Sequence, residues 1–485
     1  MVKVPRIVRD VSYKALGSYG SAGLQMLRGL LLAGLLAPAD LGTVAIVGVV
    51  LTYSLYADLG MASAVGRELP LAAGAGSESD VRIWPWYAIV TKLVAEAVVA
   101  TVLLAYVLLR WSDLAPSLRF GLLTAVAVTV LQGFVVAQQI VFDASRQFGR
   151  GAALLLILFG LLLVTCVAGG AVAGTRGVFV GQVIAFAMAT AVAAFMGGWP
   201  RPVPLQRGRL ALLLKVGFPL MVLGFAGYNL VYVDQIMVIA LLGRADLGVY
   251  MLPLYAGNFV FLVPQALAGA VGPRLIGRYG AEGTPDAIAA YTWVPVRVLS
   301  LALPPVIAAL WLLGPVLIVA LLPRYVGAIG PLRIYLAGMF FLGLNYGVST
   351  TLLALNKHRN NIPIVVGAIG LNVALDLLLV GVWHLGLNGI AMGSALTYAA
   401  YWMAHTILVR WYFGQRPLRA LLLNLASGWP GFALAGLMLL VWGAGDLGAS
   451  APLLASAILA GVLLMTALRL GRLRRHGSLL LWPRA

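Results

Sequence analysis

Long apolar runs with few charges recur along the chain from Val11 to Leu470. Each is close to the length of about 20 residues that a helix needs to cross a bilayer. The 485 residues are 62% hydrophobic and only 10% charged, whereas about 25% of an ordinary soluble domain is charged. Strands of a membrane barrel would instead alternate over segments of about ten residues. The sequence therefore predicts an all-α polytopic membrane protein with about fourteen transmembrane helices.

The helix boundaries follow from hydropathy and from breaker residues. The pattern predicts one continuous span at 42–66 and two separate spans at 151–173 and 177–198. The last two of the fourteen spans are predicted at 418–442 and 451–470.

Loop charges predict the orientation. The net charge is +18, and most of the 33 Lys and Arg residues fall in loops on one side if the N-terminus is cytoplasmic. Positive loops mark the cytoplasmic side, so both termini are expected there. The charge is then a feature of topology, and no nucleic-acid partner is expected. The basic N-terminus leads into a long apolar segment without a small-residue cleavage site, so the first helix is expected to be retained.

Two parts of the chain repeat each other. The segment LLAPADLG (Leu35–Gly42) matches LLGRADLG (Leu241–Gly248), and in the same register ASAVG (Ala62–Gly66) matches AGAVG (Ala268–Gly272). A weaker match in a shifted register joins GVFVG (177–181) to GIAMG (389–393). We interpret this as two six-helix lobes, although duplicated packing units without a transport role would give the same pattern.

The repeat predicts the domain organisation. An even number of helices gives both lobes the same orientation, with a pseudo-two-fold axis along the membrane normal, as in parallel-repeat transporters. The predicted segments are an N-lobe at 1–200, a cytoplasmic linker at 201–210, a C-lobe at 211–410, two extra helices at 411–470 and a basic cytoplasmic tail at 471–485.

A few charged residues fall inside predicted spans, where they are costly and usually face a bundle interior or a water-filled cavity. The repeat register places Asp234 of the C-lobe opposite Arg28 of the N-lobe. Such a pair could act as a gate, an ion site or a structural salt bridge. Lys92 and Glu96 are one helical turn apart and are expected to neutralise each other. Arg297 could snorkel to the cytoplasmic headgroups.

Several kinds of chemistry are not indicated by any pattern. The four histidines are scattered without metal-ligand spacing, and no P-loop or nucleophile–base pattern is present. The single cysteine, Cys166, lies in an apolar run. We therefore expect no enzyme activity, no catalytic residues, no bound metal and no cofactor, apart from H⁺ or Na⁺ as a coupling ion.

Several segments resemble the polysaccharide repeat-unit flippases of the multidrug/oligosaccharidyl-lipid/polysaccharide (MOP) exporter superfamily. The resemblance extends over nearly the whole chain and rests on the order and spacing of five segments. They are QMLRGLLLAGLLAPADLG, DLGMASAVGREL, YVDQIMVIALLGRADLGVY, LLGPVLIVALLPRYVGAIGPLRIYLAG and LLALNKHRNNIPI.

The resemblance implies a multi-pass protein of the bacterial inner membrane that moves a polyprenyl-pyrophosphate-linked oligosaccharide from the cytoplasmic to the outer leaflet by alternating access. Pyrophosphate needs cations, and we expect Arg28, Lys92 and Arg297 to bind it, since Arg offers bidentate contacts to phosphate. Candidates for coupling or gating are Asp234, Glu96, Asp376 and Asp58. Expected partners are membrane lipids, a polysaccharide polymerase and glycosyltransferases. The alternatives are a lipid II flippase and a cation-coupled multidrug exporter.

Overall fold

The computed structural model describes residues 4–355, 357–416 and 418–423, and every regular element in these ranges is a helix. The prediction of an all-α chain is confirmed for this part of the sequence. The predicted spans and tail beyond residue 423 lie outside the described residues. Eight described segments are long and apolar enough to cross a membrane, which fits a polytopic membrane protein.

The chain divides into two compact units, which we call unit 1 and unit 2. Unit 1 holds the chain up to Tyr228 together with Gly243–Gly248, and unit 2 holds Asn229–Leu242 and the chain from Val249 onward. The division falls inside helix α7, so the first part of α7 packs with unit 1 and its second part with unit 2.

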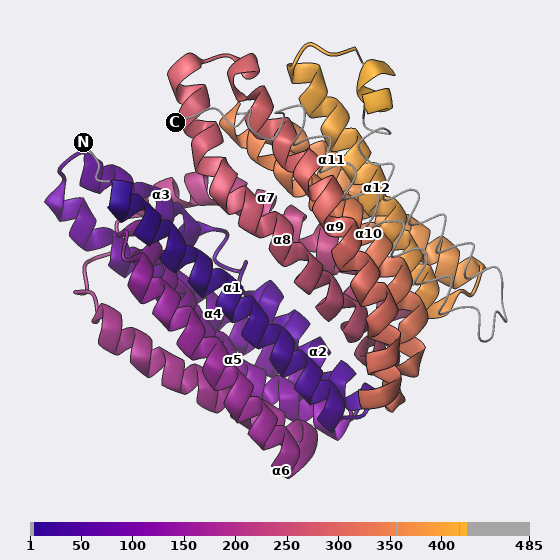
Figure 1. The fold of residues 1–485 in the computed structure, drawn as a ribbon. Coiled ribbons are helices and arrows are strands. Elements are labelled where there is room, and N and C mark those ends of the chain that lie inside the picture. The colour runs from indigo at the N-terminus through magenta and orange to yellow at the C-terminus, as the bar shows by residue number, and fades with distance from the viewer. Residues whose placement is uncertain (1–3, 356, 417, 424–485) are drawn as a thin grey trace. The chain divides into compact units, whose positions relative to one another are not determined.

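Unit 1 is a bundle in which α1 lies along α6, α5 lies between α4 and α6, and α3 packs on α4 (Figure 1). Its helices are α1 (Val4–Leu35), α2 (Pro38–Ser54), α3 (Met61–Gly74), α4 (Glu78–Leu109), α5 (Pro116–Ala144) and α6 (Phe148–Gly197).

The structure corrects the predicted span at 42–66. This segment is not one helix, because α2 ends at Ser54 and α3 begins only at Met61. Short-range turns fill the interval, and two residues in it have positive φ angles, Leu59 at 52° and Gly60 at 80°. Residues 55–60 contain no proline that would predict this interruption. Leu59 is also an unusual residue for a left-handed conformation. We call residues 55–60 the α2–α3 break.

The two spans predicted at 151–173 and 177–198 are both present within α6. Ala173 and Gly174 leave helical geometry, with Gly174 at a φ of 56°, and the chain reverses there. The two halves pack closely enough for the Thr165 hydroxyl to donate to the carbonyl of Gly181 at 2.7 Å. The GVFVG segment lies in the second half and provides the small residues that this approach requires.

Unit 2 is built mainly on α10, which packs against both α9 and α12, while α11 packs on α12. The helices from α7 onward are α7 (Arg207–Leu241), α8 (Arg244–Glu282), α9 (Pro285–Leu321), η1 (Pro323–Ala328), α10 (Ile329–Ala354), η2 (His358–Asn361), α11 (Ile362–Asp376), the π-helical η3 (Leu377–Val382) and α12 (Gly386–Tyr412).

The repeated loops form the same local structure. In the first copy a helix ends at Leu35 and the next begins at Pro38, and in the second copy the ends are Leu241 and Arg244. These positions correspond in the repeat register. The copies then differ, since α8 is continuous through the positions that match the α2–α3 break. The break is therefore a feature of the first copy alone.

The predicted linker at 201–210 is held on unit 1. Residues 198–206 have no regular secondary structure, yet side chains near the start of α4 bind them. The indole of Trp86 donates to the carbonyl of Val203 at 2.9 Å, and the hydroxyl of Tyr87 donates to that of Pro204 at 3.2 Å. An ion pair of 3.0 Å joins Arg209 to Asp80.

The two repeated loops also contact each other within unit 1, and the contact is reciprocal. A Cβ atom at Gly42 would lie 1.7 Å from the carbonyl oxygen of Arg244, and one at Gly248 would lie 1.8 Å from that of Pro38. Gly42 corresponds to Gly248 in the register, as Pro38 does to Arg244. The ADLG match thus marks a pseudo-symmetric contact in which only glycine fits.

We expect Gly42→Ala to destabilise the protein by about 1–3 kcal/mol, because a backbone carbonyl must move to admit the methyl group. Gly48→Ala is the matched control, since it lies in the same helix and has open space around its Cα. The control should be neutral or slightly stabilising. The measurement is thermal unfolding of the detergent-solubilised protein, and equal melting temperatures for the two variants would contradict the contact.

Candidate functional site

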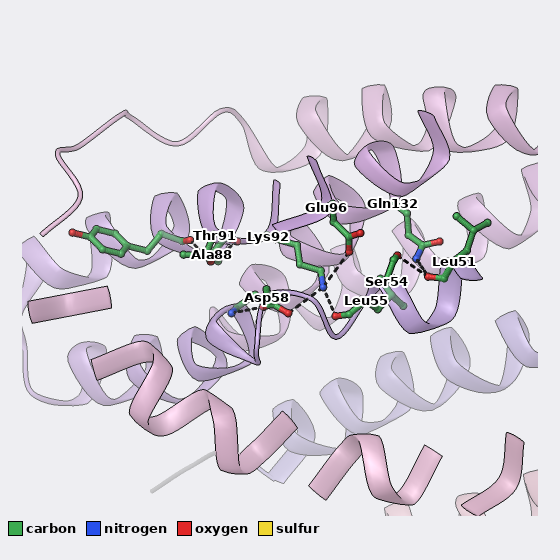
Figure 2. Close-up of polar contacts among 11 residues, drawn as sticks. Leu51, Ser54, Leu55, Asp58, Ala88, Thr91, Lys92, Glu96 and Gln132 are labelled. Atoms are coloured by element: carbon green, nitrogen blue, oxygen red, sulfur yellow. Dashed lines mark hydrogen bonds and ion pairs between the residues drawn. The ribbon is translucent and has the colours of Figure 1, made fainter. Parts of the chain in front are cut away.

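Three predicted charged residues gather in unit 1 around one ammonium group (Figure 2). The Nζ of Lys92 lies 3.2 Å from Oδ1 of Asp58 and 3.3 Å from Oε1 of Glu96. The exposed fractions of Asp58, Lys92 and Glu96 are only 3%, 2% and 0%. We call these residues the unit-1 charge cluster. The pairing of Lys92 with Glu96 follows from their spacing on α4, whereas Asp58 joins them through the tertiary fold.

The unit-1 charge cluster is tied to the α2–α3 break. Lys92 also donates to the backbone carbonyl of Leu55, which directly follows α2. The other carboxylate oxygen of Asp58 accepts a hydrogen bond of 2.8 Å from the backbone N–H of Ala62, in the first turn of α3. A helix end in the buried interior exposes backbone groups that need internal partners. Lys92 and Asp58 supply them on the two sides of the break.

Glu96 is enclosed by α5. A Cβ atom at Gly133 would lie 2.7 Å from Cγ of Glu96, so glycine there makes room for the side chain. Next to it, the amide of Gln132 and the hydroxyl of Ser54 both donate to the carbonyl of Leu51, at 2.9 Å each. These polar groups support the end of α2. Within the described chain the one cation close to Glu96 is Lys92, 3.3 Å from its Oε1, and the hydroxyl of Ser54 lies beside the carboxylate.

A second cluster lies in unit 2, where Asp234 of α7 and Asp376 at the end of α11 are both completely buried. One oxygen of Asp234 accepts hydrogen bonds from the hydroxyl of Tyr250, at 3.0 Å, and from that of Ser394. The two carboxylates are close enough for their charges to interact. We call Asp234 and Asp376 the unit-2 carboxylate pair.

Carboxylate oxygens of this pair lack partners. In the described ranges both oxygens of Asp376 accept no hydrogen bond, and the amide of Asn372 lies beside the carboxylate of Asp234. Asp376 packs directly on α12, where a Cβ atom at Gly393 would lie 2.3 Å from its Oδ1. It is also followed by the π-helical η3, and π-helical turns are frequent at functional sites.

The unit-2 carboxylate pair has the chemistry of a cation or proton site. Two buried carboxylates that share a site cannot both remain charged without compensation. Carboxylate, amide and hydroxyl oxygens are the ligands that hard cations prefer. Clusters of three or more His, Cys, Asp or Glu side chains do not occur in the described part of the chain. A bound ion would therefore draw on neutral oxygens as well as on the carboxylates.

The two predicted arginines lie apart from these clusters. Arg28 is half-buried on α1, and its guanidinium group lies beside the thiol of Cys166 on α6. Arg297 is exposed on α9, close enough to Arg410 for the two charges to interact. Arg28 belongs to unit 1 and Asp234 to unit 2, so the predicted interaction between them stays a prediction.

The sequence analysis did not identify the neutral members of the two clusters. Tyr250, Asn372 and Ser394 look like ordinary residues of apolar helices, and the carbonyl of Leu55 leaves no trace in a sequence. One signal was available, because Asn372 and Asp376 are four residues apart and so share a helix face. The hydroxyls of Tyr250 on α8 and Ser394 on α12 reach Asp234 only through tertiary packing, as the carbonyl of Leu55 reaches Lys92 on α4.

Solved structures with this fold are membrane transporters. The chain is similar to a multidrug resistance MATE family transporter of the MOP superfamily in an inward-facing conformation, with a TM-score of 0.67, 14% identity and coverage of 81% of this chain and 94% of the other. The outward-facing conformation of such a transporter gives a TM-score of 0.62 at 14% identity, with coverage of 84% and 95%. A MOP superfamily transporter from Pyrococcus furiosus gives 0.59 at 14% identity, also with coverage of 84% and 95%.

The fold is therefore that of MOP superfamily transporters. The family model described as polysaccharide biosynthesis protein matches residues 31–324. The chain belongs to this family. A search of curated proteins gave no match. Fold and family together support a membrane flippase or transporter, which agrees with the resemblance that the sequence motifs indicate.

We expect Tyr250→Phe to destabilise the protein by about 1–3 kcal/mol, because the buried carboxylate of Asp234 loses a donor. Tyr106→Phe is the matched control, since Tyr106 is 49% exposed on α4. The measurement is again thermal unfolding in detergent. The hydrogen bond would be unimportant if both variants unfolded like the wild type.

Proposed function

We propose that the protein is an alternating-access flippase that moves a polyprenyl-pyrophosphate-linked oligosaccharide from the cytoplasmic to the outer leaflet for surface polysaccharide synthesis. The observation that carries the proposal is the family match to polysaccharide biosynthesis proteins in a chain with a transporter fold. Enzymes of such a pathway act on one face of the membrane, whereas a protein with a transporter fold can move the lipid-linked oligosaccharide from one face to the other.

Arg28 is the cation best suited to the pyrophosphate. It is half-buried within a predicted span, and such arginines usually face a bundle interior or a hydrated cavity. Its guanidinium can bind two phosphate oxygens at once. Lys92, by contrast, is committed to oxygens of Leu55, Asp58 and Glu96 in this structure. We therefore assign substrate binding to Arg28, with Arg297 as a second candidate nearer the membrane surface.

The unit-2 carboxylate pair is proposed as the coupling site. A Na⁺ ion or a proton bound there would neutralise the buried negative charge, and its release would favour a different arrangement of α7, α11 and α12. A polysaccharide polymerase and glycosyltransferases are the proposed partners, because they would consume and supply the lipid-linked glycan.

Arg28→Ala is expected to lower flipping at least tenfold, since a charge-assisted contact of about 1.5–3 kcal/mol is lost. Arg28→Lys should recover part of the rate, because it keeps the charge without the bidentate geometry. The measurement is the appearance of a polyprenyl-pyrophosphate oligosaccharide at the outer leaflet of proteoliposomes, detected with a membrane-impermeant glycan reagent.

The control for this measurement is Arg110→Ala, which removes an exposed arginine that pairs with Asp113. Wild-type transport by Arg28→Ala would overturn the assignment of Arg28. Failure of the wild-type protein to move the lipid-linked oligosaccharide, together with export of cationic drugs, would replace the proposal by multidrug export. Transport of lipid II in its place would make the protein a lipid II flippase.

Gly393→Ala is expected to abolish ion-dependent stabilisation, because the new methyl group would displace the carboxylate of Asp376. A ligand that binds only the folded state raises the melting temperature as its concentration rises. The melting temperature should therefore rise with Na⁺ at constant ionic strength, or on acidification if the ion is a proton. Gly370→Ala, on α11 with open space around its Cα, is the matched control. If the melting temperatures of both variants depend on Na⁺ or pH as that of the wild type does, the ion binds outside the unit-2 carboxylate pair.

A further inference from the structure

The unit-1 charge cluster contains two carboxylates and one cation, so it holds one excess negative charge if both acids are ionised. All three side chains are buried, and an uncompensated buried charge is unstable. In the described chain the charged groups that act on Glu96 are Lys92 on its own helix and Asp58 beside the α2–α3 break. The neighbouring polar groups on α2 and α5, Ser54 and Gln132, are neutral. One of the two acids must therefore be neutralised.

The geometry distinguishes the two acids. Asp58 has a charge-stabilising partner on each oxygen, the ammonium of Lys92 on one and the N–H of Ala62 on the other. That N–H lies at the start of α3, where the helix dipole also favours an anion. Glu96 has the ammonium of Lys92, 3.3 Å from its Oε1, and the neutral hydroxyl of Ser54 beside it, but in the described residues no backbone N–H binds its carboxylate. Asp58 is thus suited to remain ionised, and Glu96 is the acid that can take up a proton.

We propose that Glu96 is a proton-binding site of unit 1 and that its proton occupancy decides whether Lys92 holds the α2–α3 break in its bent form. A proton from hydronium adds to the Glu96 carboxylate, which leaves water and a neutral carboxylic acid. The neutral acid no longer attracts the ammonium of Lys92, so Lys92 binds the carbonyl of Leu55 and the carboxylate of Asp58. When the proton leaves, the Glu96 carboxylate attracts the same ammonium and weakens its hold on the break.

The α2–α3 break transmits this change to α7 within unit 1. A Cβ atom at Gly60 would lie 2.3 Å from the carbonyl oxygen of Gly217, so the break packs directly on the α7 backbone. Two edge-to-face aromatic contacts continue the packing, Tyr53 with Phe225 at 5.8 Å and Tyr56 with Phe225 at 5.1 Å between ring centroids. Further along the same helix α7 carries Asp234. Proton binding at Glu96 therefore acts on the helix that also holds half of the unit-2 carboxylate pair.

The proton site does not depend on the identity of the substrate, and only its use in transport rests on the proposed function. The first experiment detects the proton directly. The chain has only four glutamates, Glu68, Glu78, Glu96 and Glu282. Infrared spectra of the full chain in lipid, with glutamate selectively ¹³C-labelled, should show a label-shifted carbonyl band of a protonated acid that disappears as the pH is raised.

Glu96→Gln should remove this band, whereas Glu78→Gln should keep it, because Glu78 is an exposed residue of the same helix. The proposal is overturned if the wild type shows no label-shifted band at any pH at which it is folded, or if the band persists in Glu96→Gln. Absence of the band in the wild type overturns the proposal even if the variant does not fold.

The second experiment measures hydrogen–deuterium exchange of the amides in residues 55–62 at one fixed pH. Glutamine mimics the protonated acid, so Glu96→Gln should protect these amides at least as well as the wild type. Lys92→Met should speed their exchange about tenfold or more, because the break loses its donor, a change of about 1.4 kcal/mol. If Glu96→Gln speeds exchange as much as Lys92→Met, Glu96 is an ionised structural partner and the proposal fails. If the infrared band and the exchange rates are as expected but the wild-type protein does not move the lipid-linked glycan, only the proposed function is contradicted.

Discussion

A helix that is interrupted in the buried interior of a protein must find internal partners for its free backbone groups, and unit 1 depends on one such arrangement. Lys92 binds the carbonyl of Leu55 at the end of α2, while Asp58 binds the N–H of Ala62 at the start of α3. Because Lys92 and Asp58 are buried, these bonds replace the water that would otherwise satisfy the backbone at the α2–α3 break. The same bonds draw a lysine and two acids into the interior, so the need to satisfy the backbone also creates a charge cluster.

The internal repeat is most informative where its copies differ. In both copies the first helix ends at the same register position and the ADLG segment follows. Gly42 of the first copy and Gly248 of the second each pack on the backbone of the other copy's loop. After this shared beginning, the first copy breaks at residues 55–60 while α8 continues without interruption. The second copy carries its buried acids elsewhere, at Asp234 and beside the π-helical η3. The two copies of the repeat thus differ in where they place their buried ionisable groups.

Helix α7 connects these features, because it packs on the α2–α3 break through Gly217 and Phe225 and holds Asp234 sixteen residues before Tyr250, its hydrogen-bond partner on α8. In a protein of the MOP transporter fold that belongs to a polysaccharide biosynthesis family, such a connection would give the proposed ion and proton sites a physical route to helix movement. The proposed flippase would use it to couple two buried acidic sites. Arg28, half-buried on α1, would meet the substrate.

The sequence by itself determined the membrane class, the all-α architecture and the repeat, because hydrophobic run length and loop identity are local properties. It also pointed to Asp58, Lys92, Glu96, Asp234 and Asp376, since any charge in an apolar span stands out. Only the tertiary structure decided how these charges are grouped. Asp58 meets Lys92 because the chain bends at Leu59 and Gly60, and Asp376 meets Asp234 because α7, α11 and α12 pack together. The carbonyl of Leu55 and the hydroxyl of Ser394 acquire their roles through that packing, which no local pattern encodes.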